Sequence, residues 1–309
     1  MRKSLRGSVA APTHAISHEV SSLTSAAPVT LVFGLQDPTA KWLVHHLREA
    51  GVVAVHLPPD LSTPSAQAVV AAADACLHVF SAGQGMDGTF LEYWQLCAEA
   101  GKARFVTVCD LTPVSLGVNE AAAIAGRVLE EDVLVTTLPL LDDDESVIGV
   151  LDVVTGEQWF PDGEVEGARD DFMEAVEAET NTWIDEADAL DMTPADAMLD
   201  GQLAAAVTLS TTTRAGVGWL VAHLPSRGTP AAATVLAAEG ERCVVAAGPG
   251  TLAIGPTMAL VGTTATNVQV KALASLTEPG LVARLAPGQV AAADIEPQVP
   301  IGALLLPRS

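Results

Sequence analysis

The sequence predicts an α/β domain with a mostly parallel sheet, followed by a small β-barrel. Short apolar runs rich in valine alternate with helical patterns through the first half of the chain, which is typical of βα units around a parallel sheet. After Pro230 only short strands separated by turns remain, which is typical of a small barrel. The length of 309 residues fits about two domains.

The elements of the parallel sheet are predicted from apolar runs and from helical spacing of apolar residues. The predicted strands are 29–33, 52–57, 75–82, 103–110 and 132–140. The predicted helices between them are 40–50, 65–73, 89–100 and 119–131.

A different pattern begins near residue 146. The stretch "SVIGVLDVVTGEQWFPDG" predicts a hairpin with Thr155 and Gly156 in or near its turn. Acidic helices are expected over 166–188 and over 194–203, the second with Thr193 as its N-cap. A strand, a turn and a last helix before Pro225 then complete the domain.

The expected organisation has a flexible arm, an α/β domain and a barrel. The arm would cover 1–27 and the α/β domain 28–227, with an inserted hairpin and helical part over about 146–204. The barrel would cover 229–309. Its expected strands are 231–238, 242–248, 250–262, 266–275 and 280–295.

The charge is strongly acidic and unevenly distributed. The net charge is −23, of which residues 1–228 carry −22 and residues 229–309 carry −1. An acidic chain repels phosphate backbones, which disfavours sequence-independent nucleic-acid binding, and no sequence-specific nucleic-acid partner is expected. We interpret the acidic residues as a contribution to solubility, in preference to a specific function.

Hydropathy and cysteine usage indicate a cytoplasmic protein without a membrane partner. Mean hydropathy is +0.35, but no apolar run reaches the roughly 18–20 residues of a membrane span. The N-terminus has basic residues but no apolar segment typical of a signal peptide. The four cysteines are expected to be reduced and mostly buried, because none has CxxC spacing.

The remaining acidic residues and histidines give only weak signals for a catalytic or metal site. The acidic run at 142–145 is expected to be a loop, because consecutive acids in a strand point to opposite faces. His45 and His46 are adjacent and are expected not to share a helix face. The sequence contains no HExxH zinc motif and no GxSxG nucleophile motif. We therefore expect no metal site and no alternative enzyme.

Several motifs occur in the order found in one family. "ADACLHVFSAGQGMDGTFLEYWQLCAEAGKARFVTVCD" and "LPLLDDDESVIGVLDVVTGEQWFPDG" are followed by an acidic stretch that ends in "TPADAMLDGQL". "GPGTLAIGPTMALV" and "LAPGQVAAADI" come later. Over residues 29–306 this order resembles the first two domains of translational GTPases, in particular elongation factor G and its paralogues, including ribosomal protection proteins. The resemblance implies a P-loop GTPase-like G domain followed by a translation-factor β-barrel.

The phosphate-binding loop departs from the family pattern. The pattern is GxxxxGK[ST], in which Lys contacts phosphates and the Ser or Thr hydroxyl holds Mg²⁺. Here Gly34 is followed by "LQDPTAKW", so that Lys41 comes one residue too late and Trp42 replaces the hydroxyl residue. Pro38 also removes one backbone N–H from the loop. Gly34 and Lys41 are thus vestigial, Lys41 is expected to be a solvated helix residue, and Trp42 is expected to lie in the core.

The switch segments that the family uses to sense the γ-phosphate are also altered. Between Lys41 and Asp60 there is no room for a long switch I. The switch II motif DTPGH aligns with 55–59 or with 60–64, and neither segment keeps both its aspartate and its histidine. His56 falls near the motif and is expected to be structural.

The guanine-reading motif NKxD aligns with "CDLT". Asp110 stands where the lysine should be and Thr112 where the aspartate should be. Ser210 is the residue that remains of the serine–alanine loop that flanks the base. Phosphoryl transfer depends almost wholly on positioning and charge neutralisation. The resemblance therefore implies a G domain that has lost its catalytic machinery.

The preferred interpretation is a catalytically inactive paralogue of elongation factor G, a pseudo-GTPase without a cofactor. It would consist of the G domain and domain II, without the translocating arm. Its expected partner is another protein or the factor-binding site of the ribosome. Arg242, Lys271 and Arg284 of the near-neutral barrel are candidates for approaching ribosomal RNA, although a solvated surface is slightly preferred.

Two alternatives stay open. In the first, the protein binds GTP or GDP with Mg²⁺ weakly at a rearranged site, where Lys41, Asp110 and Ser210 would contact the nucleotide. In the second, the protein is a folded remnant with a protein partner outside translation.

Overall fold

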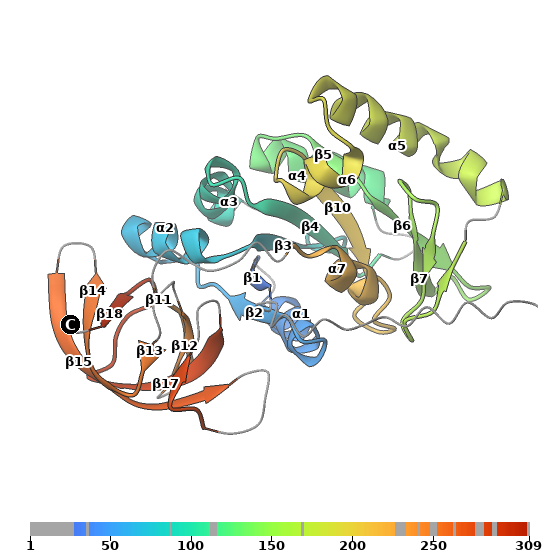
Figure 1. The fold of residues 1–309 in the computed structure, drawn as a ribbon. Helices are drawn as coiled ribbons and strands as arrows, with labels where there is room; N and C mark the ends of the chain where they lie inside the picture. The colour runs from blue at the N-terminus through green and yellow to red at the C-terminus, as the bar shows by residue number, and fades with distance from the viewer. Residues whose placement is uncertain are drawn as a thin grey trace, which may run out of the picture.

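A computed structural model of the chain contains an α/β part followed by a barrel (Figure 1). It describes residues 28–34, 37–86, 88–111, 116–167, 170–225, 233–239, 242–247, 252–261, 264–275, 281–285 and 289–307. The arm expected over 1–27 and the linker expected at 226–230 lie outside the described residues.

The α/β part is built on a six-stranded sheet in which every neighbouring pair is parallel. The strand order is β2-β1-β3-β4-β10-β5. The bounds are β1 Val29–Phe33, β2 Val53–His56, β3 Ala75–Ser81, β4 Ala103–Cys109, β5 Val133–Val135 and β10 Ala204–Leu209. The predicted α/β fold with a parallel sheet is confirmed.

Helices cover both faces of this sheet, as its buried apolar strands require. The helices of one face are α2 Thr63–Ala72, α3 Leu91–Glu99, which follows the short helix η1 Gly88–Phe90, and α4 Val118–Leu129. The helices of the other face are α1 Asp37–Glu49 and α7 Val217–His223.

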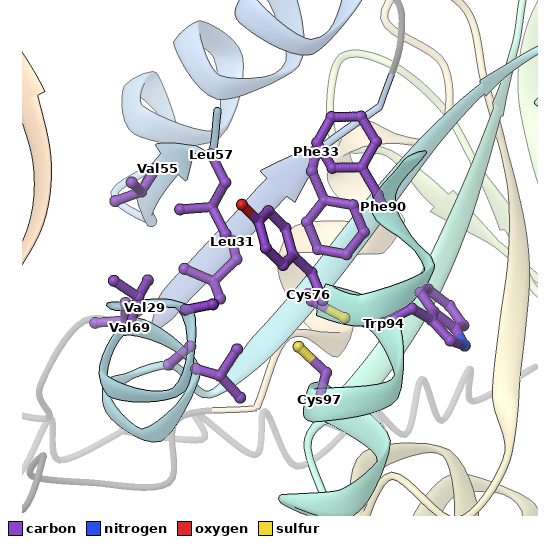
Figure 2. Packing of buried hydrophobic residues seen from close by; sticks show 14 of the residues in the cluster. Val29, Leu31, Phe33, Val55, Leu57, Val69, Cys76, Phe90, Trp94 and Cys97 are labelled. Carbon is purple, nitrogen blue, oxygen red and sulfur yellow. The ribbon is translucent and has the colours of Figure 1, made fainter. Parts of the chain in front are cut away.

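Alternate residues of each central strand pack against opposite faces of the sheet, because side chains alternate in direction along a strand. Leu31 and Phe33 of β1 belong to the cluster under α2, α3 and α4, whereas Val32 belongs to the cluster under α1 and α7. Figure 2 shows Phe33 facing Phe90, and their rings stack with centroids 5.5 Å apart.

The predicted strand over 132–140 is wrong in one respect, because the structure divides it into two strands in different sheets. β5 ends at Val135, and β6 Thr137–Leu141 pairs antiparallel with β7 Val147–Asp152. Thr136 and Thr137 make the transition. The Thr136 N–H donates to Ala206 O (2.9 Å), and the Thr137 hydroxyl oxygen accepts from the Thr208 N–H (2.8 Å). These bonds satisfy the backbone where the chain leaves the parallel sheet.

The hairpin predicted after residue 146 is present. β7 pairs with β8 Gln158–Trp159, and Gly156 lies in the turn with φ +74°. The four-stranded antiparallel sheet has the order β6-β7-β8-β9, with β9 at Val165–Glu166.

The largest differences from the predicted helix boundaries occur in the two acidic helices. The first acidic helix, α5 Asp170–Ala189, starts later than residue 166, because Glu166 belongs to strand β9 and pairs with Gln158 of β8. The second, α6 Pro194–Leu199, ends before residue 203, since Gly201 takes a left-handed conformation (φ +65°). Thr193 caps α6 as predicted, because its hydroxyl oxygen accepts from the Asp196 N–H (3.1 Å).

The barrel is closed, with the antiparallel order β11-β12-β17-β15-β14-β18. The strands are β11 Ala233–Glu239, β12 Arg242–Ala246, β14 Gly255–Val261, β15 Thr264–Ser275, β17 Val290–Glu296 and β18 Leu304–Pro307. The strands β13 Leu252–Ala253 and β16 Arg284–Leu285 form a separate pair. The sequence did not predict β18, which closes the barrel by pairing with both β11 and β14.

The barrel packs against the α/β part. Leu236 and Val244 of the barrel belong to the same buried cluster as Val69 of α2. Gly302, just before β18, approaches Ser65 of α2 so closely that a Cβ atom there would lie 2.5 Å from Ser65 Cα. Figure 1 shows α2 above the barrel strands.

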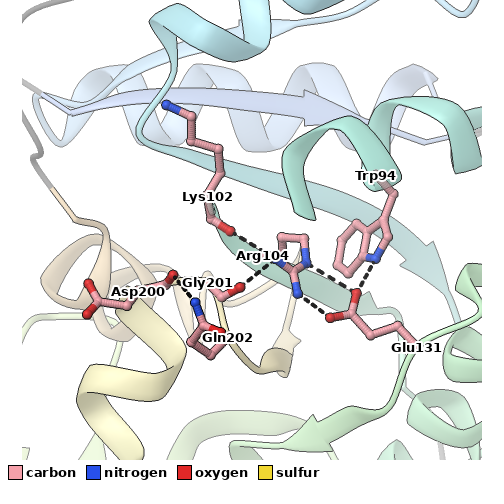
Figure 3. Close-up of polar contacts among 7 residues, drawn as sticks. All are labelled: Trp94, Lys102, Arg104, Glu131, Asp200, Gly201 and Gln202. Atoms are coloured by element: carbon pink, nitrogen blue, oxygen red, sulfur yellow. Dashed lines mark hydrogen bonds and ion pairs between the residues drawn. The ribbon is translucent and has the colours of Figure 1, made fainter. Parts of the chain in front are cut away.

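One charged network is buried in the parallel sheet (Figure 3). Arg104 of β4 is 2% exposed and pairs with the carboxylate of Glu131, which follows α4. Its Nη1 also donates to the Gly201 carbonyl (2.7 Å). Trp94 Nε1 donates to the same carboxylate (2.6 Å). The network ties β4, α3, the end of α4 and the loop after α6 together.

All four cysteines are free and buried, as predicted. Burial raises the pKa of the Cys76 and Cys109 thiols above the ordinary range. These thiols are therefore poor nucleophiles, because the thiolate is the reactive form.

Candidate functional site

The carboxyl ends of parallel strands meet at one edge of a sheet, where α/β proteins bind their ligands. Gly34 follows β1, Asp110 follows β4 and Ser210 follows β10, so the structure places these three expected residues at this edge.

The connection between β1 and α1 is too short for a phosphate-binding loop. β1 ends at Phe33 and α1 begins at Asp37, whereas in the GxxxxGK[ST] pattern a longer Gly-rich loop, whose backbone N–H groups surround phosphates, precedes the helix. Lys41 lies within α1 and is exposed, as expected.

Gly34 has a packing reason to be glycine. Its φ is +152°, and a Cβ atom there would lie 2.6 Å from Val79 O of the neighbouring strand β3. The close approach of the two strands is sufficient to account for this glycine.

Trp42 lies at the margin of the core. It is partly buried and packs against the cluster under α1 and α7, and its ring meets His46 edge-on with centroids 4.6 Å apart. The indole therefore has a packing role on α1.

Asp110 and Ser210 line one cavity of about 260 Å³. Asp110 has φ +60°, and its Oδ1 accepts from the Thr211 hydroxyl (2.8 Å). Ser210 Oγ accepts from the Thr213 N–H (3.1 Å). Glu145 adds a second carboxylate, and none of the described lining residues is basic. The described lining of the cavity therefore contains no cationic side chain to pair with a phosphate.

Gly34 and Lys41 are not among the described residues that line this cavity. Of the four expected residues, the structure thus brings only Asp110 and Ser210 together. The acidic run at 142–145 forms the turn between β6 and β7, as expected, with Asp142 Oδ1 accepting from the Ser146 N–H (2.8 Å).

The segment that aligns with switch II is fixed to α3. The Tyr93 hydroxyl donates to Pro58 O (2.9 Å) and accepts from the Leu61 N–H (2.8 Å). Burial raises the pKa of this phenol. His56 is the last residue of β2. A switch must move between two states, and these contacts favour a single arrangement.

The three candidate cations of the barrel lie on different strands. Arg242 of β12 and Arg284 of β16 are exposed. Lys271 of β15 pairs with Glu296, whose hydrogen bond raises the pKa of the lysine. Because an acid already pairs with one of the three, a shared positive patch is not supported.

An acidic groove that the sequence did not predict runs along β5, the edge strand. Two cavities of about 290 and 740 Å³ share residues of α4, β5 and α5, including Ala122, Val133 and Thr182. The charged residues that line them are Arg127, Glu130, Glu131, Asp132, Glu179 and Glu186. Acids therefore dominate the groove.

His45 is exposed and His46 is buried, which fits the expectation that they do not share a face of α1, yet both side chains reach Glu49. The side chains are long enough to converge on Glu49: His45 Nε2 lies 3.3 Å from Glu49 Oε1, and His46 Nδ1 lies 2.8 Å from Glu49 Oε2. The pattern H-H-x-x-E is the sequence signal, because Glu49 is one turn from both histidines.

No helix in the described part of the chain is long and apolar enough to cross a membrane.

Comparisons with known proteins identify the fold. No family model and no curated protein sequence matches the chain. A crystal structure of a protein from Thermus thermophilus is similar, with a TM-score of 0.63 and 15% sequence identity over 92% of this chain. The chain spans about half of that protein's length (54%). At this identity the likeness shows the fold alone, which resembles a G domain followed by a β-barrel domain.

Proposed function

We propose that this protein is a pseudo-GTPase, a noncatalytic paralogue of elongation factor G that acts by binding a protein partner. The observation that carries this proposal is the early start of α1 at Asp37, which leaves a shorter connection after Phe33 than the phosphate-binding pattern requires. A shorter loop offers fewer backbone N–H groups to surround phosphates.

The rest of the sheet edge supports the same proposal. Asp110 and Glu145 give the neighbouring cavity an acidic lining, and Tyr93 holds the segment that aligns with switch II. Phosphoryl transfer needs positive charge at the phosphates and a mobile switch.

A basic protein segment is the partner that best fits the acidic surface. The groove along β5 is lined by Glu130, Asp132, Glu179 and Glu186 with Arg127 as its one basic residue among those described. Complementary charge guides association and selects partners. We propose a ribosomal protein near the factor-binding site as the source of this segment.

Co-sedimentation with ribosomes of the host tests the proposal. We expect the full chain to pellet with ribosomes equally with and without GTP, and less as salt rises, because salt screens charge pairs. The variant Glu130→Lys/Glu186→Lys should pellet several-fold less, because it reverses charge in the groove. Asp143→Lys/Asp144→Lys makes the same charge change in the exposed β6–β7 turn and should pellet like the parent.

One observation favours a second candidate function, a weak nucleotide site, since Asp110 and Ser210 share a cavity. Titration with a fluorescent GTP analogue distinguishes it. Tight, Mg²⁺-dependent binding that Asp110→Asn or Ser210→Ala abolishes would establish this second candidate and overturn the first. Absence of pelleting under every condition would instead point to a partner outside translation.

A further inference from the structure

His45, His46 and Glu49 gather their polar atoms at the last turn of α1. One candidate ligand atom from each residue lies within 4.8 Å of the other two. Glu49 contacts both imidazoles, at 3.3 Å from His45 Nε2 and 2.8 Å from His46 Nδ1. The cluster is the one group of this kind among the described residues.

These separations suit a single metal ion. Bonds of about 2.0–2.2 Å from zinc to nitrogen and oxygen place two ligand atoms of a tetrahedral site roughly 3.3–3.5 Å apart. The distance from His45 to Glu49 Oε1 (3.3 Å) matches this value, and that from His46 to Glu49 Oε2 (2.8 Å) is shorter, so rotation of the exposed His45 and Glu49 side chains would complete the geometry.

The surroundings favour a cation. The carboxyl end of a helix carries partial negative charge, and α1 ends at Glu49. His46 is nine-tenths buried, and Trp42 packs edge-on against its ring, which holds the imidazole in place.

A cationic group already approaches the cluster from another segment. Arg214, in the turn between β10 and α7, places Nη1 3.8 Å from Glu49 Oε2. Its side chain is 59% exposed and is free to move into solvent when a metal takes its place. The arginine therefore competes with a metal for the same carboxylate.

We propose that His45, His46 and Glu49 form a binding site for a divalent transition metal of the zinc class. Two imidazoles and one carboxylate suit Zn²⁺, Co²⁺ and Ni²⁺ better than Mg²⁺ or Ca²⁺, which prefer oxygen ligands. The fourth coordination position faces solvent, because His45 and Glu49 are exposed. The site does not depend on the proposed function.

The test is titration of the full, tag-free chain with Zn²⁺ by calorimetry and with Co²⁺ by visible absorption. His14 and His18 have H-x-x-x-H spacing in the sequence and are a second source of metal binding. All measurements therefore use the background His14→Ala/His18→Ala. We expect one Zn²⁺ per chain, and a Co²⁺ spectrum with the intense bands of a four-coordinate site.

Four variants make the assignment specific. His45→Ala and Glu49→Gln should each weaken Zn²⁺ binding at least about tenfold, and both positions are exposed, so the fold is kept. Arg214→Ala should strengthen binding severalfold, because it removes the competing cation. Arg127→Ala removes the same charge from α4 and should leave the affinity unchanged.

Two results would overturn the proposal. The first is less than one Zn²⁺ bound per chain in the starting background. The second is an affinity that His45→Ala and Glu49→Gln leave unchanged, or that Arg214→Ala fails to raise above that of Arg127→Ala.

Discussion

Glu131→Gln is expected to lower the free energy of unfolding by about 3 kcal/mol, because it leaves the buried guanidinium of Arg104 without its charged partner. Arg104 is 2% exposed, and two of its nitrogens donate to this carboxylate. The estimate is at the low end of the range for buried pairs, since the Glu131 side chain is 22% exposed. Urea unfolding followed by circular dichroism measures the effect.

Glu130→Gln is the matched control. Glu130 precedes Glu131 and is exposed, so the same loss of charge there should change stability by at most about 0.5 kcal/mol. Equal stabilities of the two variants would contradict a role for the buried pair.

The double variant Arg104→Met/Glu131→Leu separates the penalty of a broken pair from the value of the intact one. Replacing a buried ion pair by apolar residues of similar volume is often neutral or stabilising. Because the variant also leaves Trp94 Nε1 and the Gly201 carbonyl without these partners, we expect it to recover part of the stability that Glu131→Gln loses. Recovery would show that the network contributes specificity of packing, joining β4 to α4 and α6, more than net stability.

The parallel sheet could be predicted because its signal is local. β3 and β4 are buried on both faces, and each reads as one apolar run flanked by helical patterns. β18 carried no such signal. Its pairing with β11 joins residues that are distant in sequence, and a four-residue apolar run before a proline does not distinguish a strand from a loop.

The sequence did not predict the division between β5 and β6, for a related reason. Apolar residues continue on both sides of Thr136 and Thr137, and only hydrogen bonds to Ala206 and Thr208 of β10 show where the chain changes sheet. Those partners lie about seventy residues later in the sequence (a separation of 71 for Thr137 and Thr208).

The candidate site was predicted only in part. Asp110 and Ser210 end neighbouring strands, so their common edge follows from the topology of a parallel sheet. The cluster of His45, His46 and Glu49 was not predicted, because the prediction considered only the directions in which adjacent helix residues leave the backbone. Long side chains that share a glutamate one turn away overcome that separation.

Gly302→Ala is expected to lower the free energy of unfolding by about 2–4 kcal/mol, from overpacking and from the cost of a left-handed backbone. Gly302 has φ +82°, and a Cβ atom there would lie 2.5 Å from Ser65 Cα and 2.7 Å from Ser65 O. These atoms belong to the buried face of α2, so the barrel or the helix must shift to remove the steric clash. Urea unfolding again supplies the measurement.

Gly85→Ala isolates the backbone cost. Gly85 has the same φ of +82°, but no atom lies within 4 Å of the position that a Cβ atom would take there. This control should lose only about 1 kcal/mol. If Gly302→Ala were no less stable than Gly85→Ala, the contact between the barrel and α2 would not contribute to folding.

Hydrogen exchange shows where the strain of Gly302→Ala is relieved. The N–H of Gly302 donates to Val235 O of β11 (2.7 Å), and Leu236 of β11 packs into the cluster that contains Val69 of α2. Separation of the barrel from α2 should therefore expose α2 and β11 to exchange, while β3 and β4 at the centre of the sheet stay protected. Uniformly faster exchange throughout the chain would mean instead that the α/β part and the barrel unfold as one unit, with the contact at Gly302 as part of a single core.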